Sequence, residues 1–101
     1  MTQATQGQNT VSWEPQAKAK FDRMIERIPL FHREIARTIV NKKAPLNARE
    51  RNSKIIEESD IVRAFFSEVP MAFYSLMVRL LHEVGFDYKK YQPKQQELAK
   101  K

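Results

Sequence analysis

The sequence contains no cysteine and only two glycines, Gly7 and Gly85. The missing cysteines exclude disulfides, zinc–thiolate sites, thiol catalysis and cysteine-ligated iron–sulfur clusters. Two isolated glycines also exclude the glycine-rich loops that bind phosphates or dinucleotides. The two histidines, His32 and His82, have no histidine or carboxylate partner at helical spacing, so a metal site is not indicated. We expect no catalytic group, no metal and no cofactor.

Long hydrophobic runs are also missing. The longest apolar stretch, residues 71–84, is too short to span a bilayer and is interrupted by Ser75, Arg79, His82 and Glu83. The N-terminus is polar and does not resemble a signal peptide. We therefore expect a cytoplasmic protein without a membrane span.

The chain has 101 residues, 42% of them hydrophobic, and a net charge of +6. Polar residues dominate both ends, which predicts a disordered polar tail over 1–11 and a disordered basic tail over 92–101. Residues 12–91 then form a single helical domain. The positive charge leaves nucleic acid open as a partner.

Prolines divide the domain into helices. The first helix is expected to begin at Ser12 as N-cap and to end at Ile28, because Pro29 forces the preceding residue out of the helical region. The same proline begins a second helix that runs to about Asn41. Apolar residues recur at helical spacing in the first helix at Trp13, Ala17, Phe21, Met24 and Ile28, and in the second at Phe31, Ile35, Ala36, Ile39 and Val40.

Prolines and a glycine also mark the expected ends of elements in the second half of the domain. Residues 41–53 read as a polar, basic connection broken by Pro45, and Lys54–Ile56 reads as extended. A third helix has Asp60 in its first turn and ends at Val69–Pro70, and a fourth is closed by Gly85. The fold class is therefore all-α: a small four-helix domain with proline-initiated helices and a short extended segment before helix three.

Aromatic residues mark the expected core: Trp13, Phe21, Phe31, Phe65 and Phe73. The fourth helix is apolar around most of its circumference, so it is either central to the fold or part of an interface. We favour the second reading, with self-association or protein docking through Phe73, Met77, Leu80, Leu81 and Val84.

One spacing pattern is more specific than an amphipathic helix. Its residues are Trp13, Ala17, Ile28, Pro29, Phe31, Arg33, Ala36 and Arg37, followed later by Ile56, Asp60, Ile61 and Ala64. The pattern resembles the C-terminal helical domain of the B subunit of light-independent (dark-operative) protochlorophyllide reductase, as a stand-alone member with a C-terminal extension. The likeness covers about residues 13–66, with an insertion at 44–53.

The resemblance implies an accessory or interaction domain. The parent enzyme receives electrons through iron–sulfur clusters, which a chain without cysteine cannot ligate, so this chain is not the reductase itself. Binding of a tetrapyrrole follows only by analogy with that family.

Basic side chains supply the remaining candidates. Arg33 and Arg37 lie on one helix face. They either pair with Glu34, Glu26 or an acidic residue of the third helix, or bind a carboxylate or phosphate of a partner. The candidate anion contacts in the connection are Lys42, Lys43, Arg49, Arg51 and Lys54. With the segments around Lys54 and Asp60, this connection also resembles the second half of a histone fold.

Two functions from different classes follow. The first is a non-enzymatic accessory or interaction domain that self-associates or docks to a protein through helix four. The alternative is a histone-fold-like DNA-binding protein that uses the basic segment 42–54.

Overall fold

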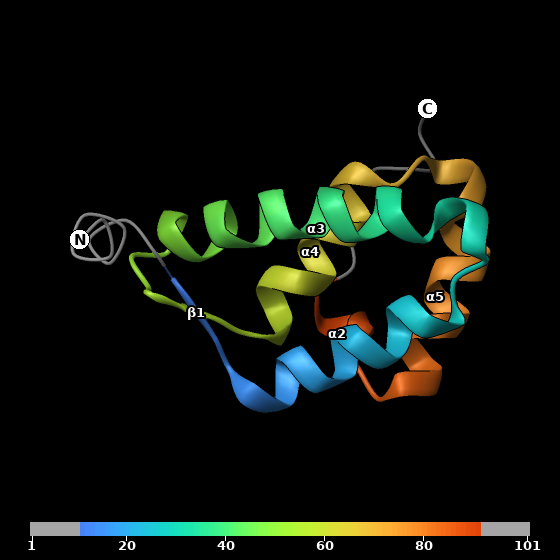
Figure 1. Cartoon of the computed structure of the whole chain (residues 1–101). Helices are drawn as coiled ribbons and strands as arrows, with labels where there is room; N and C mark the ends of the chain where they lie inside the picture. Colours follow the sequence, from blue (N-terminus) through green and yellow to red (C-terminus); the bar gives the residue numbers. More distant parts are fainter. Residues whose placement is uncertain (1–10, 92–101) are drawn as a thin grey trace, which may run out of the picture.

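The structure is a computed structural model that describes residues 11–91. Within that range the chain forms four α-helices and one pair of two-residue strands, which confirms the all-α class (Figure 1). The elements in chain order are β1 (Ser12–Trp13), α2 (Pro15–Arg27), α3 (Leu30–Glu50), β2 (Ile55–Ile56), α4 (Glu58–Glu68), the 3₁₀ turn η1 (Met71–Phe73), α5 (Tyr74–Val84) and the 3₁₀ turn η2 (Tyr88–Lys90). The two predicted tails lie largely outside the described residues.

The N-terminal end of the domain begins as a strand, so the prediction that Ser12 caps the first helix is wrong. β1 pairs in parallel with β2, with Ser12 opposite Ile55 and Trp13 opposite Ile56. This pairing holds Ser12 and Trp13 extended, and α2 begins only at Pro15. Glu14 is the N-cap instead, and its carboxylate accepts a hydrogen bond of 2.7 Å from the Ala17 amide.

The corner at Ile28–Pro29 is confirmed. Both residues are extended, with ψ angles of 139° and 142°, and α3 begins immediately after them. Arg33 closes the corner because its guanidinium donates to the carbonyl of Glu26 (2.9 Å) and to that of Ile28 (3.0 Å). These carbonyls end α2 and lack helical partners, so Arg33 acts as a C-terminal cap.

α3 continues through Pro45 to Glu50, so the connection expected over 41–53 is largely helical. Pro45 cannot donate to the carbonyl of Asn41, but Asn41 is exposed and water can satisfy that carbonyl. The buried residues around Pro45, including Ala44 and Ala48, favour the helix by tertiary packing. The chain turns out of the helix at Asn52, just after the C-cap Arg51: Asn52 has a φ of 62°, and the Ser53 amide donates to the Ala48 carbonyl at 2.9 Å.

The later elements begin and end close to where the sequence predicted. Ile55–Ile56 is extended, and α4 ends before Val69–Pro70. α5 ends at Gly85, which has a φ of 93°, and the Phe86 amide donates to the Leu81 carbonyl at 2.9 Å. The expected end of the fourth helix is therefore confirmed.

The core lies among α2, α3, α4 and α5. Phe21 and Phe65 are 2% and 1% exposed, as predicted, and half-buried Trp13 stacks on Phe21 with ring centroids 5.4 Å apart. The predictions for Phe31 and Phe73 are wrong, because these side chains are 91% and 51% exposed. The buried apolar residues are Ala17, Phe21, Met24, Ile25, Ile28, Val40, Ala44, Ala48, Ile56, Ile61, Val62, Ala64, Phe65, Phe66, Met77, Leu80, Leu81, Val84 and Phe86.

α5 is central to this fold, which corrects the interface expected on helix four. Met77, Leu80, Leu81 and Val84 are at most 6% exposed because they pack inside the chain's own core. Four of the five residues proposed for an interface are thus covered by intramolecular packing. No single helix within residues 11–91 is long and apolar enough to cross a membrane, although α4 and η1–α5 together pass on length and composition as a pair bent by 118°.

Candidate functional site

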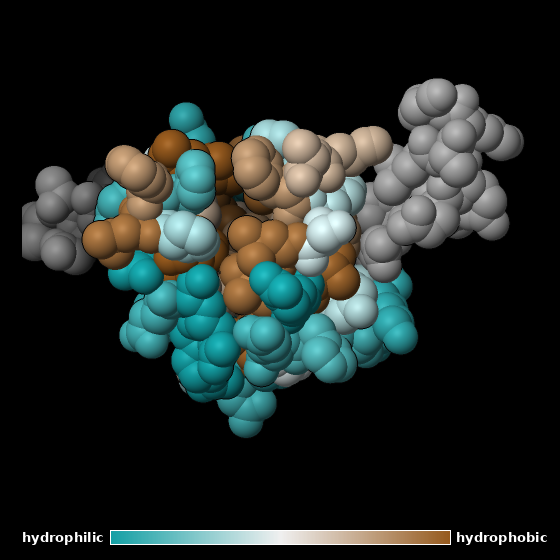
Figure 2. All heavy atoms as spheres, turned by 90° about the vertical axis from the view of Figure 1, so that its right-hand side faces the viewer, coloured by the Kyte–Doolittle hydropathy of each residue, from teal (hydrophilic) through white to brown (hydrophobic). Residues whose placement is uncertain are grey.

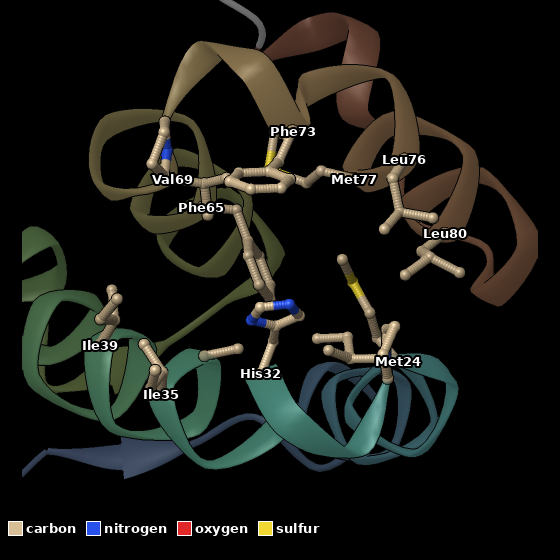
Figure 3. A pocket seen from close by; sticks show the side chains of 14 residues that line it. Met24, His32, Ile35, Ile39, Phe65, Val69, Phe73, Leu76, Met77 and Leu80 are labelled. Atoms are coloured by element: carbon tan, nitrogen blue, oxygen red, sulfur yellow. The ribbon is translucent and has the colours of Figure 1, made fainter.

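An apolar pocket opens where the start of α3 faces the end of α4, η1 and α5 (Figure 3). Its volume is about 250 Å³. α2 and α3 supply one wall and the two later helices supply the other, so the proline corners at Ile28–Pro29 and Val69–Pro70 position both walls. The lining residues are Met24, Ile28, Pro29, His32, Ile35, Ala36, Ile39, Phe65, Val69, Pro70, Phe73, Leu76, Met77 and Leu80.

His32 is the single polar side chain in this lining. Its ring centroid lies 6.1 Å from that of Phe73 across the pocket and 6.5 Å from that of Phe31 beside it. The sequence indicated no metal site at His32, and the structure brings this side chain into the lining of the pocket. The lining therefore offers one polar handle within an otherwise apolar surface.

The rim of the pocket exposes large apolar side chains. Their exposed fractions are 75% for Leu30, 91% for Phe31, 60% for Ile35, 52% for Met71 and 51% for Phe73. Figure 2 shows apolar side chains gathered over the upper part of this end of the molecule, above a polar lower part. A large aromatic side chain carries about 150–250 Å² of surface, and the five exposed fractions together equal about three such side chains, so the rim exposes roughly 600 Å². We call the pocket and these five rim residues the corner surface.

The corner surface exists because α3 has two apolar sides. Val40 and Ala44 are fully buried in the core. Phe31 and Ile35 each lie about two and a half turns before one of these residues, on the opposite side of the helix. The first side is covered by the chain itself, whereas the second is exposed. α3 is thus the helix with an unpartnered apolar face, a role that the sequence reading assigned to the fourth helix.

The arginines at the corner are engaged within the chain. Arg33 bonds the end of α2, and Arg37 forms an ion pair with Glu34, as one of the sequence-based alternatives expected. Arg27 of α2 pairs with Glu83 of α5 at 3.2 Å. Both Arg33 and Arg37 are half-buried, so they are less available to a partner than the sequence suggested.

Arg51 also has a structural partner. Its guanidinium donates to both carboxylate oxygens of Asp60, at 2.9 and 2.6 Å, and Asp60 is 0% exposed. The hydrogen bond to Asp60 is the main cause that raises the pKa of Arg51. Asp60, predicted in the first turn of its helix, in turn accepts from the Glu57 amide at 2.8 Å and so helps to cap the start of α4. Arg51 is therefore removed from the candidate anion contacts.

The other four basic candidates remain on the surface. Lys42, Arg49 and Lys54 are exposed and Lys43 is half-buried. Because α3 is continuous here, Lys42 and Arg49 lie on one helix face about two turns apart. No group of three or more potential metal-ligating side chains occurs among residues 11–91.

No curated protein and no solved structure matches the chain. The resemblance to the protochlorophyllide reductase domain gains no support from the matching family model, so it stays a prediction. That model is described as "Protein of unknown function (DUF2621)" and matches residues 5–95. The chain therefore belongs to the DUF2621 family.

Proposed function

We propose that this protein is a non-enzymatic interaction domain that binds an apolar protein surface through the corner surface. The observation that carries the proposal is a pocket of about 250 Å³ ringed by exposed Phe31, Ile35 and Phe73. A patch of roughly 600 Å² is at the upper end of what monomeric proteins expose, and patches of that size are often functional.

The size of the pocket favours a side chain of a protein partner, rather than a small molecule, as its occupant. Ligand pockets usually measure about 300–1,000 Å³, and this pocket falls below that range. A tetrapyrrole, with its four pyrrole rings, is larger than the space that the pocket offers. One aromatic or large aliphatic side chain fills it, which is how hot-spot residues anchor protein interfaces.

The chemistry of the lining supports a binding role. His32 is the one lining residue with a side chain capable of acid–base or nucleophilic chemistry, and no hydroxyl, thiol or carboxylate lines the pocket with it. General acid–base or nucleophilic catalysis usually needs at least one such second group. The pocket is therefore suited to burying an apolar group.

The charges beside the corner surface favour a protein over an anionic membrane. Arg27 and Arg37 are paired with carboxylates, and Arg33 is bonded to carbonyls. An anionic lipid surface is recognised by free lysines and arginines, each of which contributes about 1 kcal/mol. Paired charges around an apolar centre match the polar rim of a protein interface.

A selection experiment tests this proposal. A displayed library of helical peptides is selected on the wild-type chain, and we expect enriched peptides with an aromatic anchor. Ala36→Phe places a ring in the pocket and should weaken these peptides by about tenfold or more. Leu46→Ala removes an exposed apolar side chain elsewhere on α3 and should leave their binding unchanged. The proposal fails if no peptide is enriched, or if Ala36→Phe binds the peptides as well as wild type.

DNA binding by the segment 42–54 is supported less well. The structure engages Arg51 with Asp60 and leaves four of the five proposed cations available. One observation favours this alternative: α3 is a long helix that is followed by a short strand, as in a histone fold. It stays an alternative that a gel-shift assay can test.

A further inference from the structure

The corner surface carries both a protruding aromatic side chain and a cavity. Phe31 is 91% exposed, and its ring lies 6.5 Å from the ring of His32, which lines the pocket. Phe31 itself does not enter the pocket of its own chain. The Phe31 side chain, which we call the knob, and the apolar pocket, which we call the hole, therefore lie side by side on one surface.

We infer that the partner bound by the corner surface is a second copy of this chain, in a two-fold symmetric dimer where each Phe31 enters the other copy's pocket. This inference rests on the proposed function and names its partner. In a two-fold interface the same patch is used twice, so a residue of one copy contacts the pocket of the other and the reverse contact follows by symmetry. An adjacent knob and hole meet that requirement when the axis passes between them.

The dimensions of the pocket fit this contact. An apolar cavity of about 150 Å³ lined by Leu, Ile and Phe is large enough to hold benzene. The pocket here measures about 250 Å³ and is lined by the same kinds of side chain, so a phenyl ring can enter it. Phe73 and His32 lie on its walls and offer rings against which that phenyl group can pack.

Charge is compatible with self-association. The chain carries +6, so two copies repel unless the charge lies away from the contact. At the corner, the arginines Arg27 and Arg37 are paired with Glu83 and Glu34. The basic residues Lys42 and Arg49 lie further along α3, with Arg49 about 27 Å from Phe31. A two-fold axis that passes near Phe31 and perpendicular to α3 directs these basic ends away from each other.

The area predicts a dimer of moderate strength. Each copy contributes roughly 600 Å² of apolar rim, somewhat below the approximately 800 Å² per partner of a standard interface. We therefore expect a reversible monomer–dimer equilibrium at micromolar concentrations. Sedimentation equilibrium or light scattering coupled to size exclusion measures it on the full chain.

Three variants test the reciprocal contact. Phe31→Ala removes the knob, and Ala36→Phe fills the hole. Each change occurs twice in the dimer and should raise the dissociation constant by about 30-fold or more. Leu46→Ala, an exposed position outside the pocket on the same helix, should dimerise like wild type. If circular dichroism shows that Ala36→Phe is not folded, Leu76→Phe fills the same pocket from α5.

Mixing the variants separates reciprocal insertion from other dimers. Phe31→Ala retains its hole and Ala36→Phe retains its knob, so a heterodimer regains one native contact that neither homodimer has. We expect the 1:1 mixture to form more dimer than either variant alone. A Phe31→Ala protein that dimerises like wild type, or a mixture that shows no gain, overturns the inference.

The remaining outcomes identify which proposal fails. A wild-type chain that stays monomeric at submillimolar concentration but binds the selected peptides through the pocket overturns the dimer and leaves the proposed function intact. A monomeric chain that binds no peptide overturns both. A monomeric chain that sediments with phosphatidylcholine–phosphatidylserine vesicles, and loses this with Phe31→Ala, also overturns the dimer and assigns the surface to lipid.

Discussion

Replacing Arg51 with alanine should be among the most damaging single changes outside the apolar core. Asp60 is 0% exposed, and two of its three side-chain hydrogen bonds come from Arg51, at 2.9 and 2.6 Å. The third comes from the Glu57 amide at 2.8 Å. Arg51→Ala leaves a buried carboxylate with one remaining partner, at a site that joins the end of α3 to the start of α4.

The expected loss can be estimated. Removing one partner of a buried ion pair costs about 3–5 kcal/mol because the other charge is left uncompensated. The Arg51 side chain is 34% exposed, so water can reach part of the vacated space, and we expect a loss near the lower limit, about 3 kcal/mol. For a domain of this size, that corresponds to a fall in Tm of roughly 12–24 °C.

Urea denaturation measures this loss, with Trp13 fluorescence and circular dichroism as independent probes. Trp13 suits the assay because it is the only tryptophan and stacks on Phe21. Arg49→Ala is the matched control: it removes an exposed arginine from the last turn of the same helix and should change stability by less than about 0.5 kcal/mol. If Arg51→Ala is no more destabilising than Arg49→Ala, the proposed role of the ion pair is wrong.

The pH dependence of this contribution has a defined sign. The pKa of Arg51 is raised in the folded protein, chiefly by its hydrogen bond to Asp60. A base whose pKa is raised on folding stabilises the fold fully below its unfolded pKa, and the benefit is lost as pH rises through the folded pKa. Because arginine titrates far above neutrality, the difference between wild type and Arg51→Ala should be constant from pH 7 to about pH 10.

Three further predictions concern the surface and the helix ends. Phe31→Ala should leave monomer stability within about 0.5 kcal/mol of wild type, because the side chain is 91% exposed; a loss of about 3 kcal/mol or more in urea would show that Phe31 belongs to the core. Gly85→Ala should destabilise by about 1 kcal/mol, since φ is 93° while the added Cβ meets only Lys20 Cε at 3.7 Å; an unchanged midpoint would contradict this. If the chain binds duplex DNA in a gel shift, Arg49→Ala should reduce the slope of log affinity against log salt concentration by about 0.9. Arg51→Ala, measured at a temperature where the variant is folded, should leave this slope unchanged. Equal effects of the two variants would refute the assignment of Arg51 to the fold.

Local signals in the sequence predicted the C-terminal ends of α2, α4 and α5, but not that of α3. Pro29 and Pro70 act on the residue before them through a steric clash, and Gly85 supplies a backbone conformation that other residues resist. Such effects depend on neighbours in the chain, so the sequence alone was sufficient. Pro45 was misread because burial of Ala44 and Ala48 outweighs one missing hydrogen bond, and that burial depends on distant residues.

The same limit applies to the candidate site. Helical spacing identified apolar faces on both α3 and α5, but it could not show which face the rest of the chain covers. Val84 packs inside the fold, whereas Phe31 is exposed. The sequence placed Asp60 in the first turn of a helix and made Arg51 a candidate anion contact, because nothing in their spacing indicates that the two side chains meet. One signal was present: α3 carries apolar residues on opposite sides, more than one small core can bury.

The short pairing between β1 and β2 has a mechanical consequence. α2 follows one strand and α3 precedes the other, so the pairing closes the two helices and the strands into a triangle (Figure 1). The two long sides are the helices α2 and α3, which are about 20 and 32 Å long. Because all three sides have fixed lengths, the angle between the two helices is fixed as well. The angle at Ile28–Pro29 is therefore fixed, and a partner binds a surface that already has its final shape.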